Sequence, residues 1–157
     1  MEIYKQQELI YQNVISKKLI GTQKEVLNQI KSFQDEMNFL GICVYPQITV
    51  NYSSKSLAHG NYLESETFIL SNSMNVKKVK DKYTVHNELK WENVVVLDFT
   101  GLMSDVREAN DALNIYIKNN NLNVENIAYV QVNEEMAGVN PSQQVHLKIF
   151  VKEIVGC

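Results

Sequence analysis

Two halves of the 157-residue chain show the same order of predicted elements, and this internal repeat most constrains the fold. In each half a strand is followed by a helix and then by two more strands. Gly21 precedes the first predicted helix and Gly101 the second, a separation of 80 residues. The predicted ends of these helices, Gly41 and Asn121, are also 80 residues apart. Few residues are identical between the halves, so the repeat is one of pattern and indicates two similar structural units.

The first half contains a clear helix signature. Thr22 and Glu25 have the spacing of a capping box, in which a hydroxyl and a carboxylate bind free backbone amides at a helix N-terminus. From Val26 to Leu40, apolar residues recur at steps of three and four, which predicts one buried helix face. Gly41 suits the position after the helix, where a positive φ is needed. Strands are expected at residues 8–20, 47–52 and 62–71.

The second half opens with an aliphatic run at residues 94–97, which is typical of a strand covered on both faces. This strand is expected to break at Gly101, and either Thr100 or Ser104 is expected to cap the next helix. Asparagines at 119–121 are expected to end that helix, because Asn tolerates left-handed backbone. The helix face expected to contact the sheet contains Leu102, Val106, Ala109 and Leu113, and strands are expected at 127–132 and 144–151.

These patterns predict an α+β fold, in which two βαββ repeats form one antiparallel sheet with the two main helices on one face. We expect a single domain over 1–157, with repeat 1 at 1–72, a linker at 73–82 and repeat 2 at 83–157. The linker region carries four lysines, for which a solvated loop is the first interpretation and phosphate or acidic-partner binding the alternative. The sheet face opposite the helices would be open, and a groove there is the expected ligand site.

Charge and motifs exclude several classes of function. The net charge of −3 and a single arginine, Arg107, argue against a nucleic-acid partner. No apolar run approaches the roughly 20 residues of a membrane span, and no signal peptide is visible, so a cytoplasmic protein without membrane contact is expected. No phosphate loop, metal-ligand spacing or nucleophile elbow is present, so we expect no catalytic residues, no metal and no cofactor.

Aromatic side chains on predicted strands are the candidate ligand-binding residues. Each of them has an alternative role in the core or in a cross-strand pair. The candidates are Tyr11, Tyr52, Trp91, Tyr129 and Phe150.

Two segments of the chain, VVVLDFTGLMSDVREANDALNIYIKNNN and IAYVQVNEEMAGVNPSQQVHLKIFVKEI, resemble the GyrI-like effector-binding domains. These domains are related to the SOUL-type haem-binding fold, and the resemblance is one of element order and spacing. It implies a groove between the repeats that binds small amphipathic, often cationic molecules. It also implies aromatic lining residues and an acidic residue on the strand after the second helix. Some members of the family inhibit gyrase, and others hydrolyse strained-ring compounds.

In this chain the segment that matches the acidic position is Ala128–Val132, and it contains no acidic residue. Gln131 lies there instead and is added to the candidate ligand-binding residues. Because a buried carboxylate would hold a cation or polarise water, its absence argues against both the binding of a cationic ligand and hydrolysis. The hypothesis from sequence is therefore a non-catalytic module of the GyrI-like type that binds a small amphipathic or aromatic effector. The alternative is a protein-interaction or accessory protein of a bacterial operon that keeps the fold without a working ligand pocket.

Overall fold

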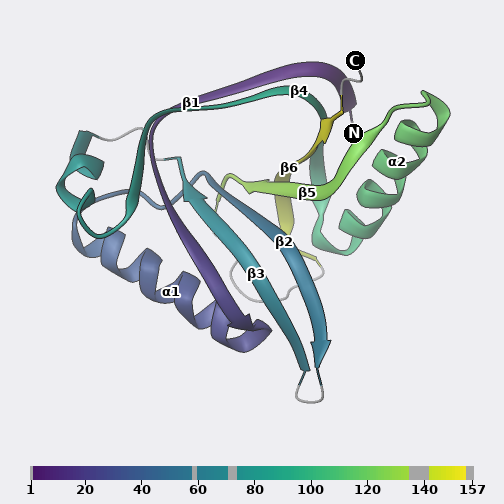
Figure 1. Ribbon diagram of the computed structural model, residues 1–157. Coiled ribbons are helices and arrows are strands. Elements are labelled where there is room, and N and C mark those ends of the chain that lie inside the picture. Colours follow the sequence, from purple (N-terminus) through teal and green to yellow (C-terminus); the bar gives the residue numbers. More distant parts are fainter. Residues whose placement is uncertain (1, 58–59, 71–73, 135–141, 155–157) are drawn as a thin grey trace. The chain divides into compact units, whose positions relative to one another are not determined.

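The computed structural model describes residues 2–57, 60–70, 74–134 and 142–154 (Figure 1). Its elements follow the order strand, helix, strand, strand in each half of the chain. A short 3-10 helix, η1, lies between the halves, and another, η2, lies directly before α2. The elements are β1 (Glu2–Thr22), α1 (Gln23–Phe39), β2 (Gln47–Leu57), β3 (Gly60–Ile69), η1 (Met74–Val79), β4 (Thr84–Leu102), η2 (Met103–Asp105), α2 (Val106–Asn119), β5 (Val124–Val132) and β6 (Gln144–Glu153).

The prediction of one open antiparallel sheet with both helices on one face is wrong. The strands are hydrogen-bonded in the order β1-β3-β2-β5-β6-β4, which is the order of a closed barrel. β1 and β4 are 21 and 19 residues long, far longer than the strands predicted at these places. Closure depends on which strands pair at the edges, and a hydrophobic pattern within each strand carries no information about that pairing.

The contacts divide the chain into two compact units. One contains Ile10–Leu89 and is here called the α1 unit; the other contains Met1–Leu9 and Lys90–Cys157 and is called the α2 unit. β1 and β4 each contribute residues to both units. This division by contacts does not test the predicted boundaries of the sequence repeats at residues 72 and 83, which stay a prediction.

The core of the α1 unit forms between α1, β1 and β3. The capping box is confirmed: the Glu25 amide donates to Thr22 Oγ1 at 3.3 Å, and the Thr22 amide donates to Glu25 Oε1 at 3.1 Å. Gly41 has a φ of 76°, as expected for the residue that follows the helix end. The stretch predicted as a linker contributes two buried valines, through η1. The buried core residues are Ile15, Phe33, Met37, Ile42, Val44, Ile69, Val76 and Val79.

The core of the α2 unit forms where α2 covers one face of β4, β5 and β6. The predicted cap of α2 is wrong, because its N-cap is Asp105 and no side chain caps it. β4 does not break at Gly101 but pairs with β6 as far as Leu102, which is 41% exposed and does not face the core. The buried core residues are Val95, Leu97, Phe99, Ala109, Leu113, Val145, Leu147, Ile149 and Val151.

The internal repeat is present in the backbone as well as in the pattern. Asn13 on β1 and Asn93 on β4, which are 80 residues apart, have φ angles of 54° and 53°. Gly21 pairs with Leu63 in the α1 unit, and Gly101 pairs with Val145 in the α2 unit. Asn121 has a φ of 51°, which confirms the predicted left-handed residue after α2. The two long strands therefore each contain a left-handed residue at equivalent positions.

Replacing Asn93 is expected to test this backbone requirement. A left-handed conformation costs a residue with a Cβ roughly 1–2 kcal/mol, less for Asn and little for Gly. We expect Asn93→Ala to lower the free energy of unfolding by about 1 kcal/mol and Asn93→Gly to change it by much less. Urea unfolding followed by far-UV circular dichroism measures both variants. If the Asn93→Ala and Asn93→Gly variants have equal free energies of unfolding, the left-handed backbone is not the reason for an asparagine at position 93.

Candidate functional site

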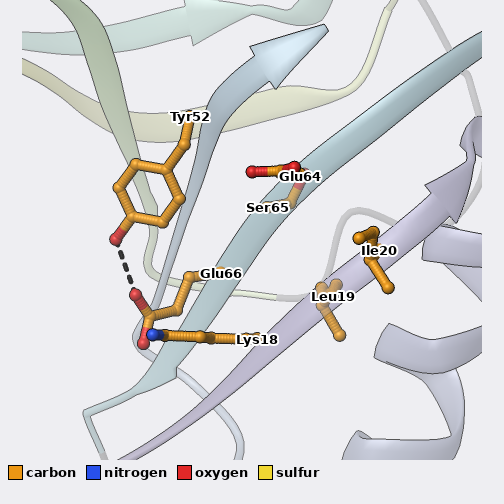
Figure 2. A pocket seen from close by; sticks show the side chains of 7 residues that line it. All are labelled: Lys18, Leu19, Ile20, Tyr52, Glu64, Ser65 and Glu66. Atoms are coloured by element: carbon orange, nitrogen blue, oxygen red, sulfur yellow. Dashed lines mark hydrogen bonds between the residues drawn. The ribbon is translucent and has the colours of Figure 1, made fainter.

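A pocket of about 440 Å³ lies in the α1 unit, over the strands β1, β2 and β3 (Figure 2). We call it the Tyr52–Glu66 pocket. Its walls combine two carboxylates, one ammonium group, a phenol and two aliphatic side chains. The lining residues are Lys18, Leu19, Ile20, Tyr52, Glu64, Ser65 and Glu66.

Strand register places the polar residues of this pocket. Lys18 on β1 lies opposite Glu66 on β3, and Figure 2 shows the Lys18 side chain extending toward the Glu66 carboxylate. The pairing of β2 with β3 shifts between Asn51 and Ser53, so Tyr52 is the extra residue of a β-bulge. A bulge leaves one residue out of the ladder and redirects its side chain. As a result the Tyr52 hydroxyl reaches β3, where it donates a hydrogen bond of 2.6 Å to Glu66 Oε1.

The electrostatics of the pocket favour a positively charged group. Glu66 is only 9% exposed, and its carboxylate accepts the hydrogen bond from Tyr52. Two carboxylates and one ammonium group leave a net negative charge in the lining. The positive charge of a bound cation would stabilise a buried carboxylate. The aliphatic side chains of the pocket would contact the apolar part of the same ligand. The pocket therefore has the chemistry to bind an amine or quaternary ammonium that carries an apolar group.

Of the six predicted site residues, Tyr52 lines this pocket and Tyr11 does not. Tyr11 lies on β1 in the same unit, and burial raises the pKa of its phenol. Glu66 is not among the site residues predicted from sequence. The available signal was an acidic residue in the middle of a predicted strand.

Three other predicted residues come together in the α2 unit, as a packed aromatic cluster. The rings of Tyr129 and Phe150 stack with centroids 4.8 Å apart, and Trp91 lies 5.5 and 5.4 Å from them. All three side chains are buried, with at most 9% exposed. Edge and stacked geometries at these distances are typical of stabilising aromatic contacts. The geometry therefore accounts for these three aromatics as core packing.

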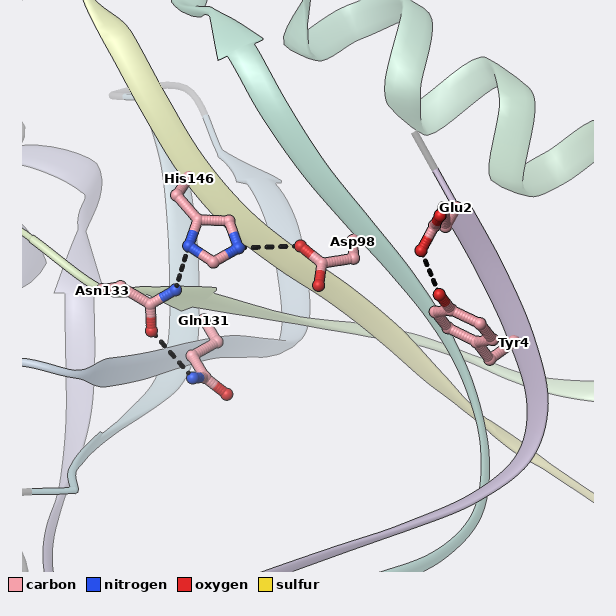
Figure 3. A network of polar contacts seen from close by, with 6 residues as sticks. All are labelled: Glu2, Tyr4, Asp98, Gln131, Asn133 and His146. Atoms are coloured by element: carbon pink, nitrogen blue, oxygen red, sulfur yellow. Dashed lines mark hydrogen bonds and ion pairs between the residues drawn. The ribbon is translucent and has the colours of Figure 1, made fainter.

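Gln131, the sixth predicted residue, belongs to a polar chain on the α2 unit (Figure 3). Its Nε2 donates to Asn133 Oδ1 at 3.0 Å, and it is 4% exposed. Asn133 Nδ2 lies 3.0 Å from His146 Nδ1, and His146 Nε2 lies 2.8 Å from Asp98 Oδ1. A neutral His146 with its proton on Nε2 satisfies both contacts. Both ring nitrogens of His146 are therefore held by neighbouring side chains of the α2 unit.

A third polar group connects α1 to the start of β4. Lys82 Nζ contacts Glu36 Oε1 at 2.7 Å, and the Tyr83 hydroxyl donates to the other Glu36 oxygen. The hydrogen bonds from Lys82 and then Tyr83 lower the pKa of Glu36 below its ordinary value of 4.5. Burial, and then the hydrogen bond to Glu36, raises the pKa of Tyr83 to about 12.

This lowered pKa predicts a pH-dependent contribution to stability. A carboxyl whose pKa is lower in the folded state stabilises the fold above its unfolded pKa, and this contribution is lost as the pH falls through the folded pKa. We therefore expect Glu36→Gln to be less stable than the wild type at neutral pH. The difference should shrink as the pH falls below 4.5. Urea midpoints measured across this range test it, and a difference independent of pH would contradict the assigned role of Glu36.

Comparison with known proteins shows the fold. No protein-family model and no curated protein sequence matches the chain. A solved structure of an uncharacterized conserved protein from Listeria innocua is similar with a TM-score of 0.58 at 12% identity, over 98% of this chain and 91% of that chain. A Listeria innocua hydrolase encoded by lin2189 is similar with a TM-score of 0.54 at 12% identity, over the same shares. Another hydrolase from Listeria innocua has a TM-score of 0.50 at 10% identity, also over 98% and 91%.

At these identities the likeness extends to the fold, and it includes proteins described as hydrolases. Among the residues that the structure describes, no cluster of His, Cys, Asp and Glu side chains could hold a metal ion. No helix in the described ranges has the length and apolar character needed to cross a membrane.

Proposed function

We propose that the protein binds a small amphipathic organic cation in the Tyr52–Glu66 pocket. The observation that carries the proposal is the Glu66 carboxylate, which is 9% exposed and hydrogen-bonded to Tyr52. Hydrogen bonds and ion pairs to a charged group in such a setting are stronger than those in water. Leu19 and Ile20 provide the apolar surface beside it. The resemblance to effector-binding domains agrees with this choice of ligand.

The pocket contains a buried acidic residue, which the segment Ala128–Val132 lacks. The expectation from sequence placed the acidic residue on the strand after the second helix, where Gln131 lies. Glu66 instead lies on β3, in the first half of the chain. A carboxylate at this place supports cation binding, against which the missing acidic residue had argued.

Binding of ethidium, an aromatic cation, tests the proposal by fluorescence titration. The anionic dye ANS serves as the comparison, since it has similar apolar surface and the opposite charge. We expect saturable ethidium binding and much weaker ANS binding at the same ionic strength. Equal binding of the two dyes, or binding of neither, would count against a cation pocket.

A second candidate is a hydrolase that uses the same pocket. Two of the similar structures are hydrolases, and Glu66 is a carboxylate that can take a proton from an attacking water. Under this candidate, release of p-nitrophenolate from p-nitrophenyl esters should exceed the buffer rate and fall in Glu66→Gln. If ethidium binds and no ester is hydrolysed above the buffer rate, the binding module remains the better description.

A further inference from the structure

A second pocket of the α1 unit, of about 310 Å³, is lined by three lysines. It lies between residues 16–18 of β1 and residues 82–84, where β4 begins. Its lining differs from that of the Tyr52–Glu66 pocket in charge and shares one residue with it, Lys18. We call it the lysine pocket. Its lining residues are Ser16, Lys17, Lys18, Lys82, Tyr83 and Thr84.

Two of the three ammonium groups are held near one ring. Lys17 Nζ lies 5.8 Å and Lys82 Nζ 5.7 Å from the centroid of the Tyr83 ring. Tyr83 is itself fixed, because its hydroxyl donates to Glu36 and its ring packs on Phe33 at 4.9 Å. A cation over an aromatic face is favoured by about 0.5–1 kcal/mol at an exposed site. The ring therefore keeps two positive charges close to the pocket before any ligand arrives.

The carboxylates near the lysine pocket do not cancel its charge. Glu36 contacts Lys82 at 2.7 Å, and the Lys18 side chain extends toward Glu66 (Figure 2). Three ammonium groups and these two carboxylates leave one positive charge. Two more lysines, Lys77 and Lys80, line a further pocket of the same unit. Because the whole chain has a net charge of −3, this positive region is a local feature that attracts anions to one place.

We propose that the lysine pocket binds the phosphate group of a small phosphomonoester. A phosphomonoester carries about −1.5 to −2 charges near pH 7 and three acceptor oxygens. Lysine ammonium groups suit it, because each is a compact charge with three donors, and the exposed Thr84 hydroxyl adds another donor. A phosphate has three acceptor oxygens and a carboxylate has two, so a phosphate can accept from more of the lysine and threonine donors at once. A volume of about 310 Å³ leaves room for an organic group beside the phosphate.

The proposal goes beyond cation binding, and an NMR titration tests it. Inorganic phosphate and phenyl phosphate are added to ¹⁵N-labelled protein while sodium chloride holds the ionic strength constant. We expect saturable shifts of the amides at residues 16–18 and 82–84. Lys17→Gln should weaken the apparent affinity by about tenfold, which corresponds to one charge-assisted hydrogen bond, and Lys17→Arg should restore most of it.

The matched control is Lys77→Gln, which removes an equal charge from the neighbouring pocket. It should change phosphate affinity much less than Lys17→Gln does. Equal weakening by both variants would show diffuse attraction, and shifts that never saturate would show no site; either result overturns the proposal. Glu66→Gln should weaken cation binding without weakening phosphate binding, so failure of one proposal is distinguishable from failure of the other. Circular dichroism verifies that each variant is folded.

Discussion

Glu66→Gln is expected to weaken ethidium binding by roughly 10- to 100-fold. The substitution keeps the shape of the side chain and its hydrogen bond with Tyr52, but it removes the charge. Hydrogen bonds to charged groups contribute about 1.5–3 kcal/mol, and each 1.4 kcal/mol is a tenfold change in the dissociation constant. The effect should be large because Glu66 is largely shielded from water. Fluorescence titration of wild type and variant at one ionic strength measures it.

The matched control is Glu64→Gln, in the same pocket and on the same strand. Glu64 is exposed, so water and salt screen its carboxylate, and its loss should change affinity by only a few-fold. Tyr52→Phe separates the role of the Glu66 charge from that of its hydrogen bond, because it removes the hydroxyl that donates to Glu66 and leaves the charge in place. If Glu64→Gln weakens binding as strongly as Glu66→Gln, the cation is attracted by the general field of the region and Glu66 is not the binding residue.

Phe33→Ala is expected to lower the free energy of unfolding by about 3–5 kcal/mol. Phe33 is 0% exposed, in the centre of α1, and its ring contacts that of Tyr83. Removing the ring costs both the transfer of apolar surface and the cavity that remains. For a domain whose total stability is about 5–15 kcal/mol, this is a large fraction. Urea unfolding followed by far-UV circular dichroism measures the loss.

Phe39→Ala is the control on the same helix, since Phe39 is 89% exposed. It should change stability by no more than about 0.5 kcal/mol. Where Phe33→Ala does not fold, Phe33→Leu keeps most of the volume and should show a smaller, measurable loss of stability. Equal effects at positions 33 and 39 would mean that α1 does not bury the face that the structure assigns to it.

The elements that could be predicted from sequence are those fixed by nearby residues. The capping box at Thr22, the glycine after α1 and the left-handed Asn121 all depend on contacts within a few residues, and the structure confirms them. The cap of α2 was predicted wrongly for the opposite reason. Pairing of Gly101 with Val145 keeps this part of the chain in β4, so Thr100 belongs to a strand and cannot begin a helix.

The candidate site could be predicted only in part. Tyr52 was selected from its aromatic side chain, but the bulge that directs it toward Glu66 arises from the register between β2 and β3. Three other aromatic residues, Trp91, Tyr129 and Phe150, were selected from sequence for the same reason. Their rings pack against one another, and this packing explains them as core residues. A residue's type shows what it can contact, whereas its exposure and register show what it does contact.

The sequence by itself determined the repeated strand–helix–strand–strand order and the buried face of α1. These follow from periodicity and from local capping, which act over a few residues. Only the tertiary structure decided that the strands follow the order of a closed barrel and that Glu66 is largely buried beside Tyr52. Both depend on strands that are distant in the chain, and pairing at that range is set by the packing of the whole fold.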